Sequence, residues 1–160
     1  MIDGAWISSL GVSSRIGIPD VYNISVRDYA PIISDMKQRL PDFPIVVDAD
    51  NGGQSYKTTK YTFQKLAALG VSLGIIENKR GAKYNSIDQS ATKLHKLEGN
   101  EIFAQKVNAA LEQDQTLVGV RLENAIVNED SHEVAMNSCM EAIDYFNQHS
   151  KPHFYVIHWK

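Results

Sequence analysis

Short apolar runs alternate with longer amphipathic stretches along most of this chain. Five runs are rich in β-branched or aromatic residues and are predicted to form strands: Ala5–Ser8, Ile45–Asp50, Val71–Ile76, Leu117–Leu122 and Phe154–Ile157. Four longer stretches repeat apolar residues at helical spacing and are predicted to form helices, over about residues 25–40, 56–69, 101–113 and 132–149. This alternation indicates an α/β fold, with a parallel sheet of about five strands, helices outside it and right-handed crossovers.

Local signals at the ends of these stretches refine the prediction. Ser25-x-x-Asp28 has the pattern of a capping box at the start of the first helix, and Pro31 is expected to bend that helix or shorten its first turn. Two segments are predicted to be loops, the serine-rich Ser8–Ser14 and the polar stretch from Glu77 to about Gly99.

Length, charge and cysteine content narrow the class of protein. A chain of 160 residues that is 43% hydrophobic can bury the core of one domain, which we expect to span residues 1–160. The formal net charge of −3 gives no general attraction for nucleic acid. The sequence contains no run typical of a membrane span or signal peptide, and the single Cys139 cannot form an internal disulfide. We therefore expect a cytoplasmic protein with neither nucleic-acid nor membrane partners.

Two aspartates close the second predicted strand. Asp48 and Asp50 are two residues apart, so on a strand their side chains would point to the same face. Two carboxylates this close are expected to bind a cation or to share a proton. Oxygen ligands without sulfur favour Mg²⁺, and Glu77 at the end of the next strand could complete the set. The alternative is that the two aspartates only cap the strand before a turn.

Basic side chains occur at the ends of two later strands. Arg121 lies on an otherwise apolar strand, where burial is costly unless the guanidinium is paired, and its planar fork matches a carboxylate or a phosphonate. A structural ion pair with Glu123 or Glu77 is the alternative. His158 follows the last strand and could donate a hydrogen bond to an anion, although an isolated histidine there is more often structural.

The loop after the third strand brings in a resemblance to a known family. Glu77-x-Lys79-x-x-x-Lys83-x-Asn85-Ser86 resembles the Glu-Asp-Lys-x-x-Pro-Lys-x-Asn-Ser gating loop of phosphoenolpyruvate mutases, members of the isocitrate lyase superfamily. Five further motifs resemble the family in the same order: Gly4-Ala-Trp-Ile-Ser-Ser-Leu10, Gly17-Ile-Pro-Asp20, Val46-Val-Asp-Ala-Asp50, Val120-Arg-Leu-Glu123 and Val156-Ile-His158. The resemblance therefore covers nearly the whole chain.

The resemblance implies a (β/α)8 TIM-barrel type of fold that is incomplete here. A complete barrel typically needs about 250 residues, and the match begins at what would be the family's second strand and stops just after the sixth. A fragment, an unusual minimal protein and a chain completed by a partner all stay open. Because the edges of a parallel sheet are seldom left uncovered, we expect association, as a homo-oligomer or with a missing barrel segment.

The resemblance also implies a role for each candidate residue. The implied Mg²⁺ ligands, direct or through water, are Asp48, Asp50 and Glu77. The implied substrate-binding residues, which cradle the pyruvoyl group, are Trp6, Ser8, Ser9 and Leu10. The implied catalytic residues are Asp20, Lys83, Asn85, Ser86, Arg121 and His158. Asp20 would lie near the migrating phosphoryl group, as nucleophile or as orienting group, and the three loop residues would close over the phospho end and exclude water.

Together these matches imply an isomerase that interconverts phosphoenolpyruvate and phosphonopyruvate with Mg²⁺, as in phosphonate biosynthesis. Asn85 favours this mutase over a phosphonopyruvate hydrolase, because hydrolase-like sequences tend to place Thr there. A carbon–carbon lyase of a 2-oxo or 2-hydroxy acid is a second alternative, disfavoured because a Lys-Lys-Cys-Gly-His loop is absent. A non-catalytic barrel remnant is the third. The sequence departs from the family at Asn51–Gln54, at Asn78, where Asp is usual, and at Arg80-Gly81-Ala82, which should loosen the gate.

Overall fold

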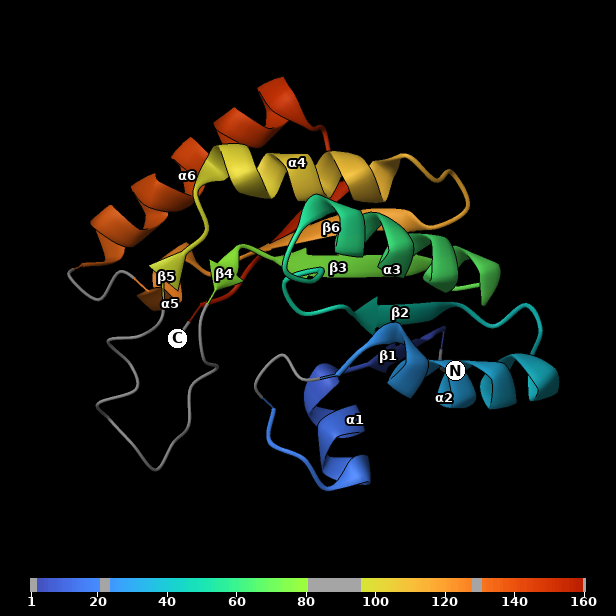
Figure 1. The fold of residues 1–160 in the computed structure, drawn as a ribbon. Helices are drawn as coiled ribbons and strands as arrows, with labels where there is room; N and C mark the ends of the chain where they lie inside the picture. The colour runs from blue at the N-terminus through green and yellow to red at the C-terminus, as the bar shows by residue number, and fades with distance from the viewer. Residues whose placement is uncertain (1–2, 21–23, 81–95, 128–130, 160) are drawn as a thin grey trace.

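Five parallel strands form the sheet that organises the molecule (Figure 1). The computed structural model describes residues 3–20, 24–80, 96–127 and 131–159. The strands follow one another across the sheet in the order β1 (Ala5–Ile7), β2 (Ile45–Asp48), β3 (Leu73–Glu77), β6 (Leu117–Leu122) and β7 (Phe154–Ile157). Every neighbouring pair is parallel, so all five carboxyl ends lie along one edge. The predicted α/β fold with a five-stranded parallel sheet is confirmed.

The four predicted helices cover one face of this sheet. They are α2 (Val26–Arg39), α3 (Tyr56–Ala68), α4 (Asn100–Leu111) and α6 (His132–His149). Strand residues that face them, such as Val47 and Val120, are fully buried in two apolar clusters with helix residues that include Ile33, Phe63 and Phe146. Burial of these alternating strand positions explains why the hydrophobic pattern predicted the elements well.

The opposite face of the sheet differs along its length. Among the described residues, its amino-terminal end carries apolar side chains that are exposed: Trp6 is 52% exposed and Leu117 is 50% exposed. At its carboxyl end the same face carries Asp48, Glu77 and Arg121, the last two directly paired in the register of β3 and β6. The polar end of this face is therefore where chemistry is expected.

One segment predicted as a loop is a helix. Ser9–Ile16 forms α1, which begins after Ser8, whose side chain accepts a hydrogen bond from the Gly11 N–H at 3.0 Å. It ends at Gly17, which has a φ of 73° in the left-handed region. The serines of this segment are weak helix formers, but an N-cap serine and a C-terminal glycine are the standard boundary signals, and burial of Val12 adds tertiary support.

The predicted start of α2 is confirmed, and one of the two effects expected of Pro31 is not observed. The capping box of α2 is present, with Asp28 Oδ2 accepting from the Ser25 N–H at 2.7 Å. The helix runs from Val26 without a break, so Pro31 does not shorten its first turn.

Strand β2 ends at Asp48 rather than at the predicted Asp50, because Asp50 takes a φ of 52° and leaves the extended conformation. Side-chain alternation along a strand therefore does not set the direction of Asp50.

The segment predicted as a polar loop from Glu77 to Gly99 contains additional regular structure at both ends. Strand β4 (Lys79–Arg80) pairs antiparallel with β5 (Lys96–Leu97), and the Glu98 N–H donates to the Asn78 carbonyl at 2.8 Å. A short helix, α5 (Asn124–Val127), follows β6 and was also not predicted.

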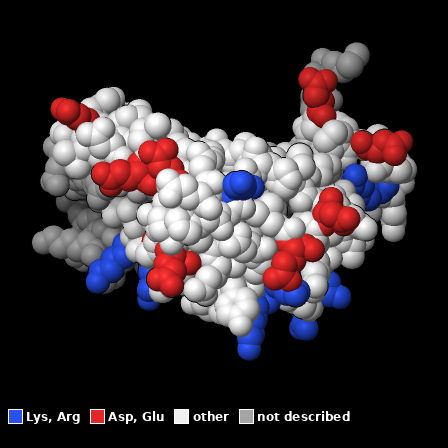
Figure 2. Space-filling view, turned by 90° about the horizontal axis from the view of Figure 1, so that it is seen from above, with Lys and Arg blue, Asp and Glu red and all other residues white. Residues whose placement is uncertain are grey.

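The outer surface is mixed in charge. On the face that Figure 2 presents, acidic and basic side chains are interspersed, with uncharged surface between them. None of the described helices is long and apolar enough to cross a membrane.

Candidate active site

Arg121, at the end of β6, occupies the centre of the carboxyl edge. Its Nη1 lies 3.0 Å from Asp48 Oδ2, its Nε lies 2.8 Å from Glu123 Oε1, and its Nη2 pairs with Glu77. The Arg121 side chain is 16% exposed, so all three contacts lie in partly or fully buried surroundings. Burial disfavours the charged guanidinium, but the three carboxylates outweigh that effect and raise the pKa of Arg121 above its ordinary value. The guanidinium therefore stays charged and holds the ends of β2, β3 and β6 together.

The carboxylate of Glu123 contacts three basic side chains at this edge. Besides Arg121, its carboxylate contacts Lys79 Nζ at 3.4 Å and His158 Nδ1 at 3.0 Å. Burial alone would raise the pKa of Glu123, but Lys79, the hydrogen bond with His158 and Arg121 together lower it. Glu123 is thus held as a carboxylate, a role that the sequence indicated only through its two-residue spacing from Arg121.

Two buried amides fix the backbone of Glu123. The Glu123 N–H donates to Asn78 Oδ1 at 2.8 Å, and Asn78 Nδ2 donates to Asn124 Oδ1 at 2.8 Å. Asn124 Nδ2 in turn donates to the Ser138 carbonyl, which sets the orientation of its amide. Asn78 must therefore both donate and accept, which a carboxylate at this position could not do. The departure from the family pattern at Asn78 is thus matched by Asn124 in this chain.

The three predicted Mg²⁺ ligands lie at the same edge, but they do not form a closed group. Asp48 and Glu77 both contact Arg121, while Asp50 lies in the turn after β2, where its N–H donates to Asp48 Oδ1 at 3.2 Å. Among the described residues, no three or more His, Cys, Asp or Glu side chains are placed to hold a metal ion together.

The chemistry of the donor set nevertheless fits Mg²⁺. Four carboxylates, each at most 6% exposed, lie at this edge together with the basic side chains of Arg121, Lys79 and His158. The carboxylates are those of Asp48, Asp50, Glu77 and Glu123. Negative charge is therefore in excess, and Mg²⁺ is commonly bound through only one or two carboxylates while it keeps several waters. A preformed cage of three side chains is not required.

Tyr29 lies beside this edge and was not singled out from the sequence. Its hydroxyl donates to the Asp48 carbonyl at 2.7 Å. Burial, followed by the charges of Asp50, Asp48 and Asp20, raises the pKa of Tyr29 above its ordinary value, so the phenol stays neutral. Asp20, the third of these charges, is itself half-buried. The only available signal was the position of Tyr29 on the apolar stripe of its helix.

The remaining predicted site residues divide into two groups. The first group lies where β1 passes into α1. Trp6 and Leu10 are exposed there, and Ser9 is buried. The Ser8 side chain caps the start of α1. Lys83, Asn85 and Ser86 lie outside the described residues.

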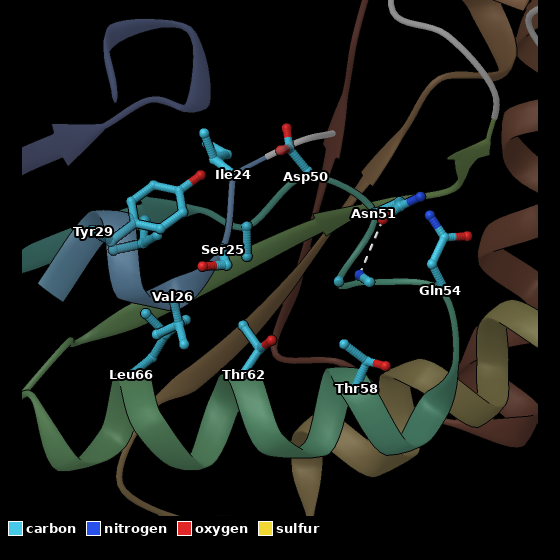
Figure 3. A pocket seen from close by; sticks show the side chains of 14 residues that line it. Ile24, Ser25, Val26, Tyr29, Asp50, Asn51, Gln54, Thr58, Thr62 and Leu66 are labelled. Atoms are coloured by element: carbon cyan, nitrogen blue, oxygen red, sulfur yellow. Dashed lines mark hydrogen bonds between the residues drawn. The ribbon is translucent and has the colours of Figure 1, made fainter. Parts of the chain in front are cut away.

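A cavity of about 200 Å³ lies next to the turn that follows β2 (Figure 3). The polar residues Ser25, Gln54, Thr58 and Thr62 contribute to its lining, and Asp50 and Asn51 border it. The remaining lining includes the apolar side chains of Ile24, Val26, Val47 and Leu66. The cavity therefore reaches the predicted ligand turn from the side of α2 and α3.

Comparisons with known proteins agree with this arrangement. The family model of phosphoenolpyruvate phosphomutase matches residues 1–148. Among solved structures, a phosphoenolpyruvate phosphomutase from Streptomyces platensis subsp. rosaceus superposes with a TM-score of 0.83 at 23% identity, covering 99% of this chain and 53% of that one. A phosphonopyruvate hydrolase in complex with oxalate and Mg²⁺ gives 0.79 at 20% identity, covering 99% and 52%.

A third structure extends the likeness to another reaction class. A 2,3-dimethylmalate lyase, a member of the PEP mutase/isocitrate lyase superfamily, gives a TM-score of 0.75 at 15% identity, covering 98% of this chain and 50% of that one. The chain thus spans about half the length of the solved structures it matches. At these identities the superpositions establish the fold, which is the predicted TIM-barrel type represented here by five strands.

Proposed function

This chain belongs to the phosphoenolpyruvate phosphomutase family, and from that premise we propose that it functions as a Mg²⁺-dependent isomerase that interconverts phosphoenolpyruvate and phosphonopyruvate. The observation that carries the proposal is the strand-end cluster around Arg121, in which a permanently charged guanidinium lies among buried carboxylates. The carboxylate or phosphonate group of such a substrate matches the guanidinium, and a divalent cation matches the excess of carboxylates.

The described residues would divide the work between two ends of the substrate. Mg²⁺, when bound, would be held by Asp48, Asp50 and Glu77 and would neutralise charge on the oxygens of the pyruvate unit. Arg121, fixed by Glu123, would orient the anionic substrate through N–H donors directed away from its present carboxylate contacts. An imidazolium at His158, held through Nδ1 by Glu123, would donate a hydrogen bond from Nε2 to the same anion.

The proposed reaction moves one phosphoryl group and consumes no water. In the direction from phosphonopyruvate, the C3–P bond breaks, the electron pair stays on the pyruvate enolate, and the enolate oxygen forms the new P–O bond of phosphoenolpyruvate. Asp20 would lie near the phosphorus, as orienting group or as transient acceptor. Trp6, Ser8, Ser9 and Leu10 would bind the pyruvoyl group, and Lys83, Asn85 and Ser86 would exclude water at the phospho end.

The similar hydrolase and lyase structures keep two other reactions open. Hydrolysis of phosphonopyruvate would use the same substrate and deliver the phosphoryl group to water, whereas a lyase would break a carbon–carbon bond. Asn85 favours the isomerase, because an amide holds phosphoryl oxygens without acting as an acid or base. A catalytically inactive barrel remnant is the alternative outside enzymology.

Phosphorus NMR distinguishes these possibilities. Phosphonopyruvate is incubated with Mg²⁺ and with the wild-type chain, the Asp20→Ala variant or the Asn85→Thr variant. We expect phosphoenolpyruvate from the wild type, and a loss of about 10²–10⁴ in rate for Asp20→Ala, the range typical of a positioned catalytic group. Inorganic phosphate with pyruvate would instead identify a hydrolase, and folded proteins that leave phosphonopyruvate unchanged would indicate a lyase or a remnant.

A further inference from the structure

Lys106 lies on α4 and is almost completely buried, with only 1% of its surface exposed. A lysine is seldom buried to this degree unless its ammonium is paired. Its Nζ lies 2.8 Å from Glu98 Oε2 and donates to the Asn51 carbonyl at 3.3 Å. Glu98 is itself 7% exposed, so the ion pair is inside the protein and is not a surface contact.

The second contact joins α4 to the turn that follows β2. Asn51 is the residue after Asp50, and it is only 6% exposed, so water does not readily replace a lost donor to its carbonyl. The cation of Lys106 therefore contacts the turn at its backbone, one residue away from a proposed Mg²⁺ ligand. The distance in sequence between Asn51 and Lys106 is 55 residues, which makes this a tertiary constraint.

This turn needs such constraints because of its backbone conformation. Asp50, Gly52 and Gly53 have φ values of 52°, 74° and 109°, and a left-handed conformation is unfavourable for the aspartate. Hydrogen bonds hold the turn from several sides: the Gly52 N–H donates to the Ala49 carbonyl at 2.9 Å, and the Glu77 N–H donates to the Asp50 carbonyl at 2.7 Å. Lys106 adds a charge-assisted hydrogen bond from the helical layer.

From this geometry we infer that Lys106 is a positioning residue, which fixes the turn at Asn51 and thereby the carboxylate of Asp50 at the mouth of the site. Lys106 reaches the turn through the Asn51 carbonyl, so this contact acts through the backbone. Its effect on metal binding rests on the proposed function, whereas its effect on the turn does not.

Hydrogen–deuterium exchange measured by mass spectrometry tests the inference on the 160-residue chain. Removing Lys106 alone would leave Glu98 buried without its cation, so the test variant is Lys106→Met combined with Glu98→Gln. In the single variant Glu98→Gln the ammonium can still donate to the introduced amide oxygen and to the Asn51 carbonyl, so this variant is the matched control. A second control is Lys60→Met, which removes an exposed pair with Glu112.

We expect exchange in peptides that cover residues 49–53 to become about tenfold faster in the double variant and to stay near the wild-type rate in both controls. Exchange in peptides from β6 reports global stability and corrects for any general loss. Equal exchange of the turn in the double variant and in Glu98→Gln, after this correction, would overturn the inference.

A magnesium titration of the same proteins separates the two proposals. We expect the Mg²⁺ concentration for half-maximal thermal protection in the presence of oxalate to rise about tenfold in the double variant relative to Glu98→Gln. If the turn loosens as expected but the wild type gains no protection from Mg²⁺ and oxalate, the role of Lys106 in the turn stands and the proposed function fails. If protection is present in the wild type and unchanged in the double variant, the inference about Asp50 fails and the proposed function stands.

Discussion

At the scale of single residues, the cluster around Arg121 contains ion pairs that the sequence could predict only from the spacing of the charged residues. Arg121 and Glu123 are two apart on a strand, and this spacing predicted that their side chains would meet, as they do. The ion pairs with Glu123 and Glu77, considered as an alternative to a substrate ligand, are both formed. The role of Arg121 toward a substrate stays a prediction, because ion pairing and substrate binding can use different N–H groups of one guanidinium.

Glu123 gives a prediction at this scale that depends on pH. Its pKa is lower in the folded protein than in the unfolded chain, so its ionised form stabilises the fold above the unfolded pKa of about 4.3, and that contribution is lost as the pH falls through the folded value. Urea unfolding should show Glu123→Gln to be less stable than wild type by about 1–3 kcal/mol at pH 7, with a smaller difference at about pH 3.

The matched control for this experiment is Glu112→Gln, which removes a carboxylate that is 53% exposed and paired with Lys60. We expect its stability difference from wild type to stay within about 1 kcal/mol at both pH values. A difference between wild type and Glu123→Gln that is the same at pH 7 and pH 3 would show that ionisation of Glu123 does not support the fold.

At the scale of elements, hydrophobic periodicity predicted the helices and strands that bury a stripe of apolar side chains. It missed elements whose position is set by the residues at their boundaries. The stripe that includes Cys139 on α6 is core, as predicted, and burial raises the pKa of its thiol. Helix α1 was missed because its boundary residues, rather than its apolar content, determine it. The end of β2 was placed two residues late because a single left-handed residue, Asp50, interrupts an otherwise strand-like run.

Packing between α3 and β3 supplies a prediction at this scale. A Cβ added at Gly74 would lie 2.7 Å from the ring of Phe63, which is completely buried. Gly74→Ala should therefore lower the free energy of unfolding by about 1–3 kcal/mol, as measured by urea denaturation. Gly99→Ala is the control, because its Cβ would meet nothing within 4 Å, and its cost should stay below about 1 kcal/mol. Equal effects of the two substitutions would contradict the packing argument.

At the scale of the whole molecule, the fold was predictable because two independent patterns agree. Alternating apolar runs indicated a parallel sheet with helices outside it, and motifs in family order indicated which strand ends are expected to form the site. Contacts such as that between Lys106 and Asn51 were not predictable, since nothing in local sequence couples residues on different elements. The apolar side chains that remain open on the sheet, including Trp6 and Leu117, support the predicted association, which sedimentation at micromolar concentration would test.

The central claim is that the carboxyl edge of the sheet is a Mg²⁺-dependent site for a pyruvate-like acid, and thermal unfolding with ligand tests it most directly. Mg²⁺ and oxalate together should raise the melting temperature of the wild type, by an amount that corresponds to about 2.7 kcal/mol at 100 times the dissociation constant. Asp48→Ala should lose this protection, whereas Asp35→Ala, at an exposed position on α2, should keep it. Absence of protection in the wild type, or equal protection in Asp48→Ala, would contradict the claim.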